Sequence, residues 1–197
     1  MNVSALILAG GKATRLGGID KRELRIDGVS IFERQVAVLA PLVAEIIVSS
    51  PREIAGFRCV TDAIEGAGPL AGIAAGLAAM RTEWLVVVAG DMPYITAALV
   101  ELVISRIADD HDAVGIRIGD LPEPLFCALR STVAPAIERR LGSGQRKASR
   151  LLTDGDLRVC WLTETALRAI DPELRALFNV NTPADLDRGV LGSTDPV

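Results

Sequence analysis

Short apolar runs alternate with longer segments of helical periodicity along most of the chain. Residues 3–9 and 84–89 are almost continuously apolar, which is typical of strands covered on both faces of a sheet. Residues 31–42 have helical spacing, with Ser30 as the expected N-cap and Glu33 as its capping-box partner. By the same criteria, further strands are expected at residues 45–49, 58–61, 113–118, 125–129 and 157–162, and further helices at residues 69–80, 96–108, 132–141 and 147–152.

This alternation of strands and helices predicts the fold class. Units of strand, crossover helix and strand produce a mostly parallel sheet, because parallel neighbours need a long connection. We therefore expect an α/β protein with an open, doubly wound, mostly parallel sheet and helices on both faces. Neither an internal repeat nor a long linker divides the 197 residues. One domain is therefore expected over residues 1–190, followed by a frayed tail over residues 191–197.

The composition excludes several classes of protein. Half of the residues are apolar and 23% are charged, which is typical of a globular protein rather than a disordered or collagen-like one. The formal net charge of −4 argues against a surface for nucleic acid or an anionic membrane. The longest uncharged apolar stretch, residues 66–80, is shorter than the roughly 20 residues of a membrane helix, and the first lysine follows the N-terminal apolar segment. We expect a cytoplasmic protein.

The histidine and cysteine content limits the chemistry further. The cysteines at positions 59, 127 and 160 form no Cys-x-x-Cys pair, so neither a disulfide framework nor a thiolate zinc site is expected. His111 is the one histidine and lies among aspartates, and it is interpreted as a surface loop residue. A histidine-rich metal site is therefore excluded.

The segment after the first apolar run contains the strongest chemical signal. In a doubly wound sheet, ligands bind beyond the carboxyl ends of the strands. Here the sequence reads LAGGKATRLGGIDK, with four glycines and three cations in fourteen residues. Glycines such as Gly10 and Gly11 let backbone N–H groups approach a phosphate chain, and Arg15 and Lys21 can neutralise its oxygens. The segment is neither a Walker loop nor a dinucleotide fingerprint. The alternative is a flexible surface turn with scattered charges.

An aspartate follows the second buried strand in the sequence VVVAGDMP. A hard carboxylate oxygen at the end of a buried strand is well suited to hold Mg²⁺ against the phosphates of a nucleotide. Asp91 is therefore the expected metal ligand. The alternative is structural, because aspartate is also favoured in turns.

Two further segments carry candidate ligand-binding groups. Asp62 follows a predicted strand, and its carboxylate can accept hydrogen bonds from the adjacent N–H donors of guanine, although a structural role explains it equally well. Gly68 is placed to touch a ligand at the start of the next helix, whereas glycines 72 and 76 suit close helix packing. Near the C-terminus, Asn179 and Asn181 project from the same face of an extended segment and offer two amides to one ligand or metal.

Five cations gather near a Gly-Ser-Gly sequence. Such clusters usually form solvated helix faces, and the alternative is contact with a second phosphorylated substrate. They occupy positions 139, 140, 146, 147 and 150.

These motifs together resemble the molybdenum cofactor guanylyltransferases, a family of nucleotidyltransferases. The matching segments are LAGGKATRLGGIDK, TDAIEGAGPLAGI, GDMPYI, PEPLFCAL and NVNTP, in family order across residues 6–185. Relatives that transfer a cytidylyl group usually carry alanine where this chain has Gly10, which favours guanine as the base.

The resemblance implies a reaction and a set of site residues. It implies transfer of GMP from GTP to the terminal phosphate of molybdenum-bound molybdopterin, with release of pyrophosphate. Arg15, Lys21 and Asp91 would be catalytic, Asp91 would hold Mg²⁺, and Asn179 and Asn181 would contact the acceptor or the metal. The residues implied to contact GTP are Leu8, Ala9, Gly10, Gly11, Arg15, Lys21, Asp62, Gly68 and Asp91.

The same resemblance divides the domain and suggests partners. A nucleotide-binding half would cover about residues 1–110 and an acceptor-binding half about residues 111–190. The expected partners are GTP, molybdenum-molybdopterin and assembly proteins of molybdoenzymes, and the chain is expected to be a monomer. Three alternatives stay open: cytidylyl transfer to the same acceptor, nucleotidyl transfer to a sugar phosphate, and a non-catalytic GTP-binding module.

Overall fold

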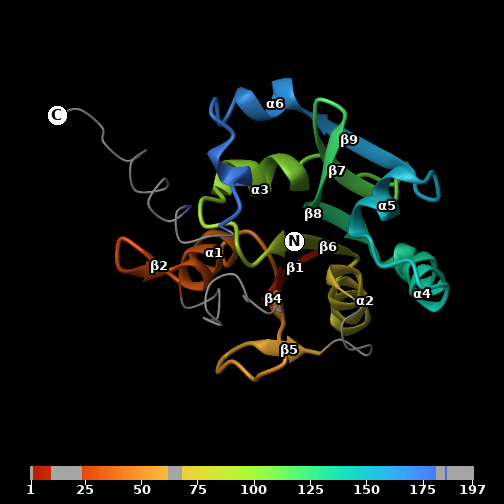
Figure 1. Ribbon diagram of the computed structural model, residues 1–197, viewed down its shortest axis with the longest axis horizontal. Helices are drawn as coiled ribbons and strands as arrows, with labels where there is room; N and C mark the ends of the chain where they lie inside the picture. The colour runs from red at the N-terminus through yellow and green to blue at the C-terminus, as the bar shows by residue number, and fades with distance from the viewer. Residues whose placement is uncertain (1, 10–23, 62–67, 181–184, 186–197) are drawn as a thin grey trace.

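A seven-stranded mixed sheet forms the centre of the protein (Figure 1). The computed structural model describes residues 2–9, 24–61, 68–180 and 185. The strands are β1 (Val3–Leu8), β4 (Glu45–Ser49), β5 (Arg58–Val60), β6 (Trp84–Ala89), β7 (Ala113–Ile118), β8 (Leu121–Arg130) and β9 (Val159–Thr163). Their order is β5-β4-β1-β6-β8-β7-β9, and within this sheet only β8 runs antiparallel to its neighbours. The expected open, mostly parallel sheet is confirmed.

Helices cover both faces of this sheet (Figure 1). They are α1 (Ile31–Leu39), α2 (Pro69–Ala79), α3 (Ala97–Ile104), α4 (Ala134–Gly142), α5 (Ala148–Thr153) and α6 (Glu164–Arg168). Apolar residues of α1, α3 and α6 form one buried cluster with alternate residues of β1 and β6. Residues of α2, α4 and α5 form a second cluster with the intervening residues of the same strands. No helix within the described ranges is long and apolar enough to cross a bilayer.

Local sequence explains where these helices begin. Ser30 and Glu33 form the expected capping box, in which the N–H of Glu33 donates to Ser30 Oγ at 3.1 Å and the N–H of Ser30 donates to Glu33 Oε2 at 2.9 Å. Thr96 caps α3 through a 3.2 Å hydrogen bond from the N–H of Leu99. Both helices end earlier than their apolar spacing predicts, α1 at Leu39 and α3 at Ile104.

Close packing explains a glycine of α2. A Cβ atom added at Gly76 would lie 2.6 Å from Leu6 Cδ2 in β1, closer than real atoms approach. The small residue therefore lets α2 lie directly on the central strand, and the packing role expected for Gly76 is confirmed.

The order of the strands defines a topological switch point. From β1 the chain passes to β4 and β5 on one side of the sheet, and then crosses to β6 on the other side of β1. In such sheets the carboxyl ends of the two strands at the switch point form the ligand-binding crevice. The relevant edge is therefore the one at which β1 and β6 end, called here the carboxyl edge.

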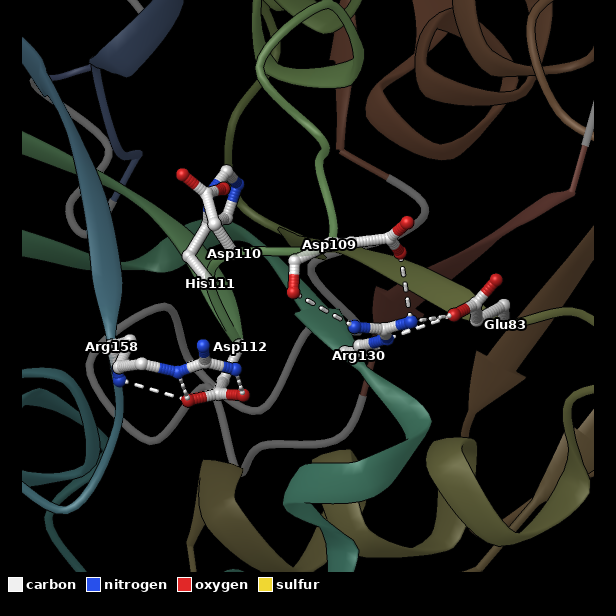
Figure 2. Close-up of polar contacts among 7 residues, drawn as sticks. All are labelled: Glu83, Asp109, Asp110, His111, Asp112, Arg130 and Arg158. Atoms are coloured by element: carbon white, nitrogen blue, oxygen red, sulfur yellow. Dashed lines mark hydrogen bonds and ion pairs between the residues drawn. The ribbon is translucent and has the colours of Figure 1, made fainter.

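Ion pairs join several loops at the opposite edge (Figure 2). Arg130, at the end of β8, bonds Glu83 Oε1 at 2.5 Å and Asp109 Oδ1 at 3.0 Å. Arg158 pairs with Asp112 Oδ1 at 2.9 Å, just before β9 and β7 begin. These contacts connect the segments before β6, β7 and β9 with the end of β8, and they lie away from the carboxyl edge.

His111 lies in this same region, and its burial contradicts a prediction made from the sequence. The expectation of a surface residue is wrong, because the residue is only 9% exposed. Its ring lies edge-on to Trp84, with centroids 5.9 Å apart. One ring nitrogen lies 2.8 Å from Oδ1 of Asp110, which Figure 2 shows beside it. The other lies 2.6 Å from the carbonyl oxygen of Arg106. The neighbouring aspartates suggested solvent, but the indole ring covers the imidazole.

Candidate functional site

The turn after β6 lies against the end of β1. The N–H of Gly90 donates to the carbonyl oxygen of Leu8 at 3.0 Å. A Cβ atom at Gly90 would lie 2.7 Å from that oxygen and 3.2 Å from the Cα atom of Ala9, so only glycine permits this approach. Asp91 follows immediately and is half-buried. The structure thus brings Leu8, Ala9 and Asp91 together, and the glycine-rich segment begins beside the aspartate.

Several predicted nucleotide-binding residues cannot be placed. Gly10, Gly11, Arg15, Lys21 and Asp62 lie outside the described residues. Their roles stay predictions that rest on the sequence.

Gln35 fixes the turn that carries Asp91, and the sequence analysis missed it. Its side chain is fully buried in α1, and its Nε2 donates to the carbonyl oxygens of Ala89 at 2.7 Å and Met92 at 3.0 Å. These two residues flank Gly90 and Asp91. Two hydrogen bonds in a buried environment therefore hold the turn in one conformation. The sequence contained a signal for this role, because Gln35 is a polar residue on the apolar face of the helix predicted over residues 31–42.

The C-terminal asparagine segment also meets Asp91. The N–H of Val180 donates to the backbone carbonyl oxygen of Asp91 at 2.8 Å. Val180 is fully buried and packs with Leu24 and Ile31, which anchors the segment. Asn179 is half-buried, and its Nδ2 donates to the carbonyl oxygen of Leu177 at 3.2 Å. Asn181 lies outside the described residues. The structure therefore brings the region of Asn179 to the same turn as Asp91.

A second carboxylate, Glu123, lies near this turn and was not predicted. Burial raises the pKa of Glu123, the N–H of Leu125 lowers it, and the negative charge of Asp91 raises it further. The antiparallel ladder between β6 and β8 explains this proximity, because it pairs Val88, near the end of β6, with Phe126, so the first residues of β8 lie at the carboxyl edge. The segment PEPLFCAL, which contains Glu123, matched the family pattern in the sequence, but none of its residues was predicted to belong to the site.

These groups fit a divalent cation. Two half-buried carboxylates, Asp91 and Glu123, concentrate negative charge here, and hard oxygen donors of this kind suit Mg²⁺. Among the described residues, no group of three or more His, Cys, Asp or Glu side chains could hold a metal by itself. Asp91 is consequently the centre of the candidate site, and the remaining ligands would come from substrate, water or the asparagine segment.

Gly68 lies at the same edge but has different neighbours. It caps α2 with a φ of +75°, a conformation that favours glycine, and it is exposed. A Cβ atom there would lie 3.8 Å from the carbonyl oxygen of Arg146. The connection between α4 and α5 therefore borders the start of α2.

The basic cluster divides into buried and exposed members. Arg140 is only 5% exposed and pairs with Asp154 and Asp156, so the interpretation as a solvated helix face is wrong for this residue. It is buried because α4 turns this position toward the loop that follows α5. Arg146 and Lys147 are exposed in the connection beside Gly68.

Comparisons with known proteins agree with this architecture. The model of the MobA-like NTP transferase domain matches residues 5–159. The chain is 34% identical to a probable molybdenum cofactor guanylyltransferase of Methanosarcina acetivorans, over 96% of this chain and 90% of that protein. It is 32% identical to a molybdenum cofactor guanylyltransferase of Pseudomonas putida, over 76% and 81%. The crystal structure of molybdopterin-guanine dinucleotide biosynthesis protein A from Archaeoglobus fulgidus superposes with a TM-score of 0.78 at 27% identity, covering 96% of this chain and 97% of that one.

Proposed function

The chain belongs to the MobA-like NTP transferase family, and we propose that it is a molybdenum cofactor guanylyltransferase that transfers GMP from GTP to the terminal phosphate of molybdenum-molybdopterin. An oxygen of the acceptor phosphate attacks the α-phosphorus of GTP. A new phosphoanhydride bond forms, the bond between the α- and β-phosphates breaks, and pyrophosphate leaves. No covalent intermediate on a protein side chain is required.

The main barrier to this reaction is electrostatic. Two phosphate groups, both negatively charged, must approach in line with the leaving pyrophosphate. When bound, Mg²⁺ neutralises charge on the phosphates of GTP. Asp91 would hold that cation, because it lies in the turn after β6, which meets the end of β1. Gln35 would keep the turn, and hence the carboxylate, in one position.

The glycine-rich segment would bind the triphosphate. Its first residues, Leu8 and Ala9, lie beside Gly90, so phosphates bound by Gly10 and Gly11 would be close to Asp91. We propose that Arg15 and Lys21 donate to phosphate oxygens and stabilise the charge that develops in the transition state. Asp62 would accept hydrogen bonds from guanine.

The acceptor would approach from the other half of the chain. We propose that about residues 1–110 bind the nucleotide and about residues 111–190 bind the acceptor, with Asn179 and Asn181 on the acceptor or the metal. The hydrogen bond from Val180 to Asp91 supports this division, because it joins the asparagine segment to the metal-binding turn.

One observation carries the proposal: the 3.0 Å hydrogen bond from Gly90 to Leu8, which joins the start of the segment proposed to bind phosphate to the turn proposed to hold the metal. The test incubates the protein with labelled GTP, Mg²⁺ and molybdenum-loaded molybdopterin. We expect pyrophosphate release and labelled GMP on the acceptor. Asp91→Asn, which keeps the size of the side chain and removes its charge, is expected to abolish both.

The same assay separates the alternatives. Preference for CTP in competition with GTP would indicate cytidylyl transfer, and turnover only with a sugar phosphate would change the acceptor. Tight binding of GTP without turnover, unaltered by Asp91→Asn, would indicate a binding module. Absence of pyrophosphate release with a loaded acceptor would refute the proposed function.

A further inference from the structure

The connection between α4 and α5 reaches the carboxyl edge because β8 is reversed. β8 ends at Arg130, on the edge opposite the carboxyl edge. The helix that follows, α4, therefore runs back toward the carboxyl edge. Residues 143–147, which connect α4 to α5, lie at that edge. The carbonyl oxygen of Arg146 is 3.8 Å from the position of a Cβ atom on Gly68. Arg146 and Lys147 are exposed at this place, and phosphate groups attract such side chains.

Arg140 holds this connection from within. Its Nη1 donates to Asp154 Oδ2 at 3.0 Å and to Gln145 Oε1 at 3.1 Å, and its Nη2 donates to Asp156 Oδ2 at 2.5 Å. Its carbonyl oxygen accepts from the N–H of Gln145 at 2.8 Å and from Ser143 Oγ at 3.0 Å. One residue therefore bonds both the connection and the loop after α5. We call Arg140, Asp154 and Asp156 the Arg140 ion-pair cluster.

The energetics of this cluster suggest a role in geometry. The guanidinium group of Arg140 is buried, whereas the side chains of Asp154 and Asp156 are 29% and 49% exposed. Desolvation opposes much of the Coulomb attraction in a buried ion pair, so such a pair contributes little net stability compared with apolar packing. The hydrogen bonds of the pair nevertheless join the segments that carry its members. In this protein those segments are the basic connection and its supporting loop.

We propose that Arg140 is a positioning residue, and that its ion-pair cluster fixes the α4–α5 connection beside Gly68 so that Arg146 and Lys147 contact a phosphate group of a substrate. This inference rests on the proposed function. The phosphate belongs either to GTP or to the acceptor. Because Arg140 is covered by protein, it acts through the connection and not by touching the substrate itself.

The test compares Arg140→Gln with a matched control, Arg130→Gln. Arg130 also bonds two carboxylates, but at the opposite edge (Figure 2). For each variant, urea unfolding, kcat, and the KM for GTP and for molybdenum-molybdopterin are measured. We expect both variants to lose stability. Arg140→Gln should raise one of the two KM values about tenfold with kcat nearly unchanged, because a charge-assisted phosphate contact is misplaced. The control should leave both KM values unchanged.

The substrate whose KM rises identifies the source of the phosphate. Equal KM values in Arg140→Gln and the wild type would overturn the inference, and so would equal increases in the two variants. If Arg140→Gln does not fold, Asp156→Asn is measured instead, because it removes one half-exposed carboxylate of the cluster and perturbs the fold less. Unchanged KM values in that variant would likewise overturn the inference. Absence of transfer by the wild type would overturn the proposed function as well, so the two failures are distinguishable.

Discussion

Gly90→Ala is expected to separate the end of β1 from the turn that carries Asp91. The added Cβ atom would meet backbone, at 2.7 Å from the carbonyl oxygen of Leu8 and 3.2 Å from the Cα atom of Ala9. Backbone atoms of a central strand cannot rotate away as a side chain can, so the two segments must move apart by several tenths of an ångström. Overpacking of this kind costs about 1–3 kcal/mol of unfolding free energy.

The same displacement should also lower the activity. A displacement near 1 Å between catalytic groups lowers the rate about 100-fold, so kcat/KM should fall by roughly 10- to 100-fold. Pyrophosphate release under saturating Mg²⁺ measures the rate, and urea unfolding measures the stability. A loss of about 2 kcal/mol corresponds to a midpoint shift of about 1 M urea.

Gly76→Ala is the matched control for this prediction. Its Cβ atom would lie 2.6 Å from Leu6 Cδ2, a close contact with a side chain of the same strand, away from the carboxyl edge. Because the Leu6 side chain can rotate where backbone cannot, we expect a loss of stability no greater than that of Gly90→Ala, and nearly normal kcat/KM. If Gly90→Ala and Gly76→Ala retain kcat/KM values within about threefold of each other, the proposed importance of the junction between β1 and β6 is refuted.

Three further outcomes are expected. Gln35→Leu removes the buried side-chain donor to the carbonyl groups of Ala89 and Met92, so it should destabilise the protein by about 1–3 kcal/mol. It should also weaken Mn²⁺ binding measured by electron paramagnetic resonance, and unchanged Mn²⁺ affinity would contradict the positioning role. Lys21→Ala should lower kcat about 100-fold and change KM much less in steady-state assays, whereas an intact kcat would assign Lys21 to ground-state binding. Hydrogen bonds from Arg158 lower the pKa of Asp112 to about 2, so this pair stabilises the fold above pH 4 and its contribution disappears as the pH falls toward 2. The side chain of Arg158 is 62% exposed, so solvent screens the pair and its contribution is about 1 kcal/mol. Asp112→Asn should therefore be less stable than the wild type by that amount at pH 6. Near pH 2 the two proteins should be equally stable in urea titrations.

Apolar continuity predicted the central strands well. The observed bounds of β6 and β7 coincide with residues 84–89 and 113–118, and β1 differs from its prediction only at the last residue. β1 and β6 are buried on both faces, so nearly every position is apolar and the signal is almost continuous. The candidate site followed from the same signal, because residues at the ends of such strands gather at one edge.

Other elements gave weak or misleading signals. β8 begins at Leu121, four residues before the predicted start, because Pro122 and Pro124 argue against a strand. The two-residue strands β2 (Arg25–Ile26) and β3 (Val29–Ser30) were too short for a periodicity, although the positive φ angles of Asp27 and Gly28 show that an Asp-Gly turn joins them.

The roles of three side chains depend on contacts far apart in sequence. Gln35 acts on a turn more than fifty residues away, and Glu123 meets Asp91 only because β8 pairs with β6. In the sequence, Arg140 belongs to a run of cations, which predicted a solvated side chain. In the structure, it pairs with two aspartates that follow α5. No local pattern encodes such partners, because tertiary packing determines them.

The central claim is that a nucleotide and a divalent cation bind where β1 and the turn after β6 meet. The most direct measurement is a crystal structure with a non-hydrolysable GTP analogue and Mn²⁺, in which anomalous scattering locates the metal. We expect Mn²⁺ bonded to the carboxylate of Asp91 and to a phosphate oxygen, with the triphosphate along the segment that follows Ala9. A metal bound elsewhere, or a triphosphate distant from Asp91, would contradict the account.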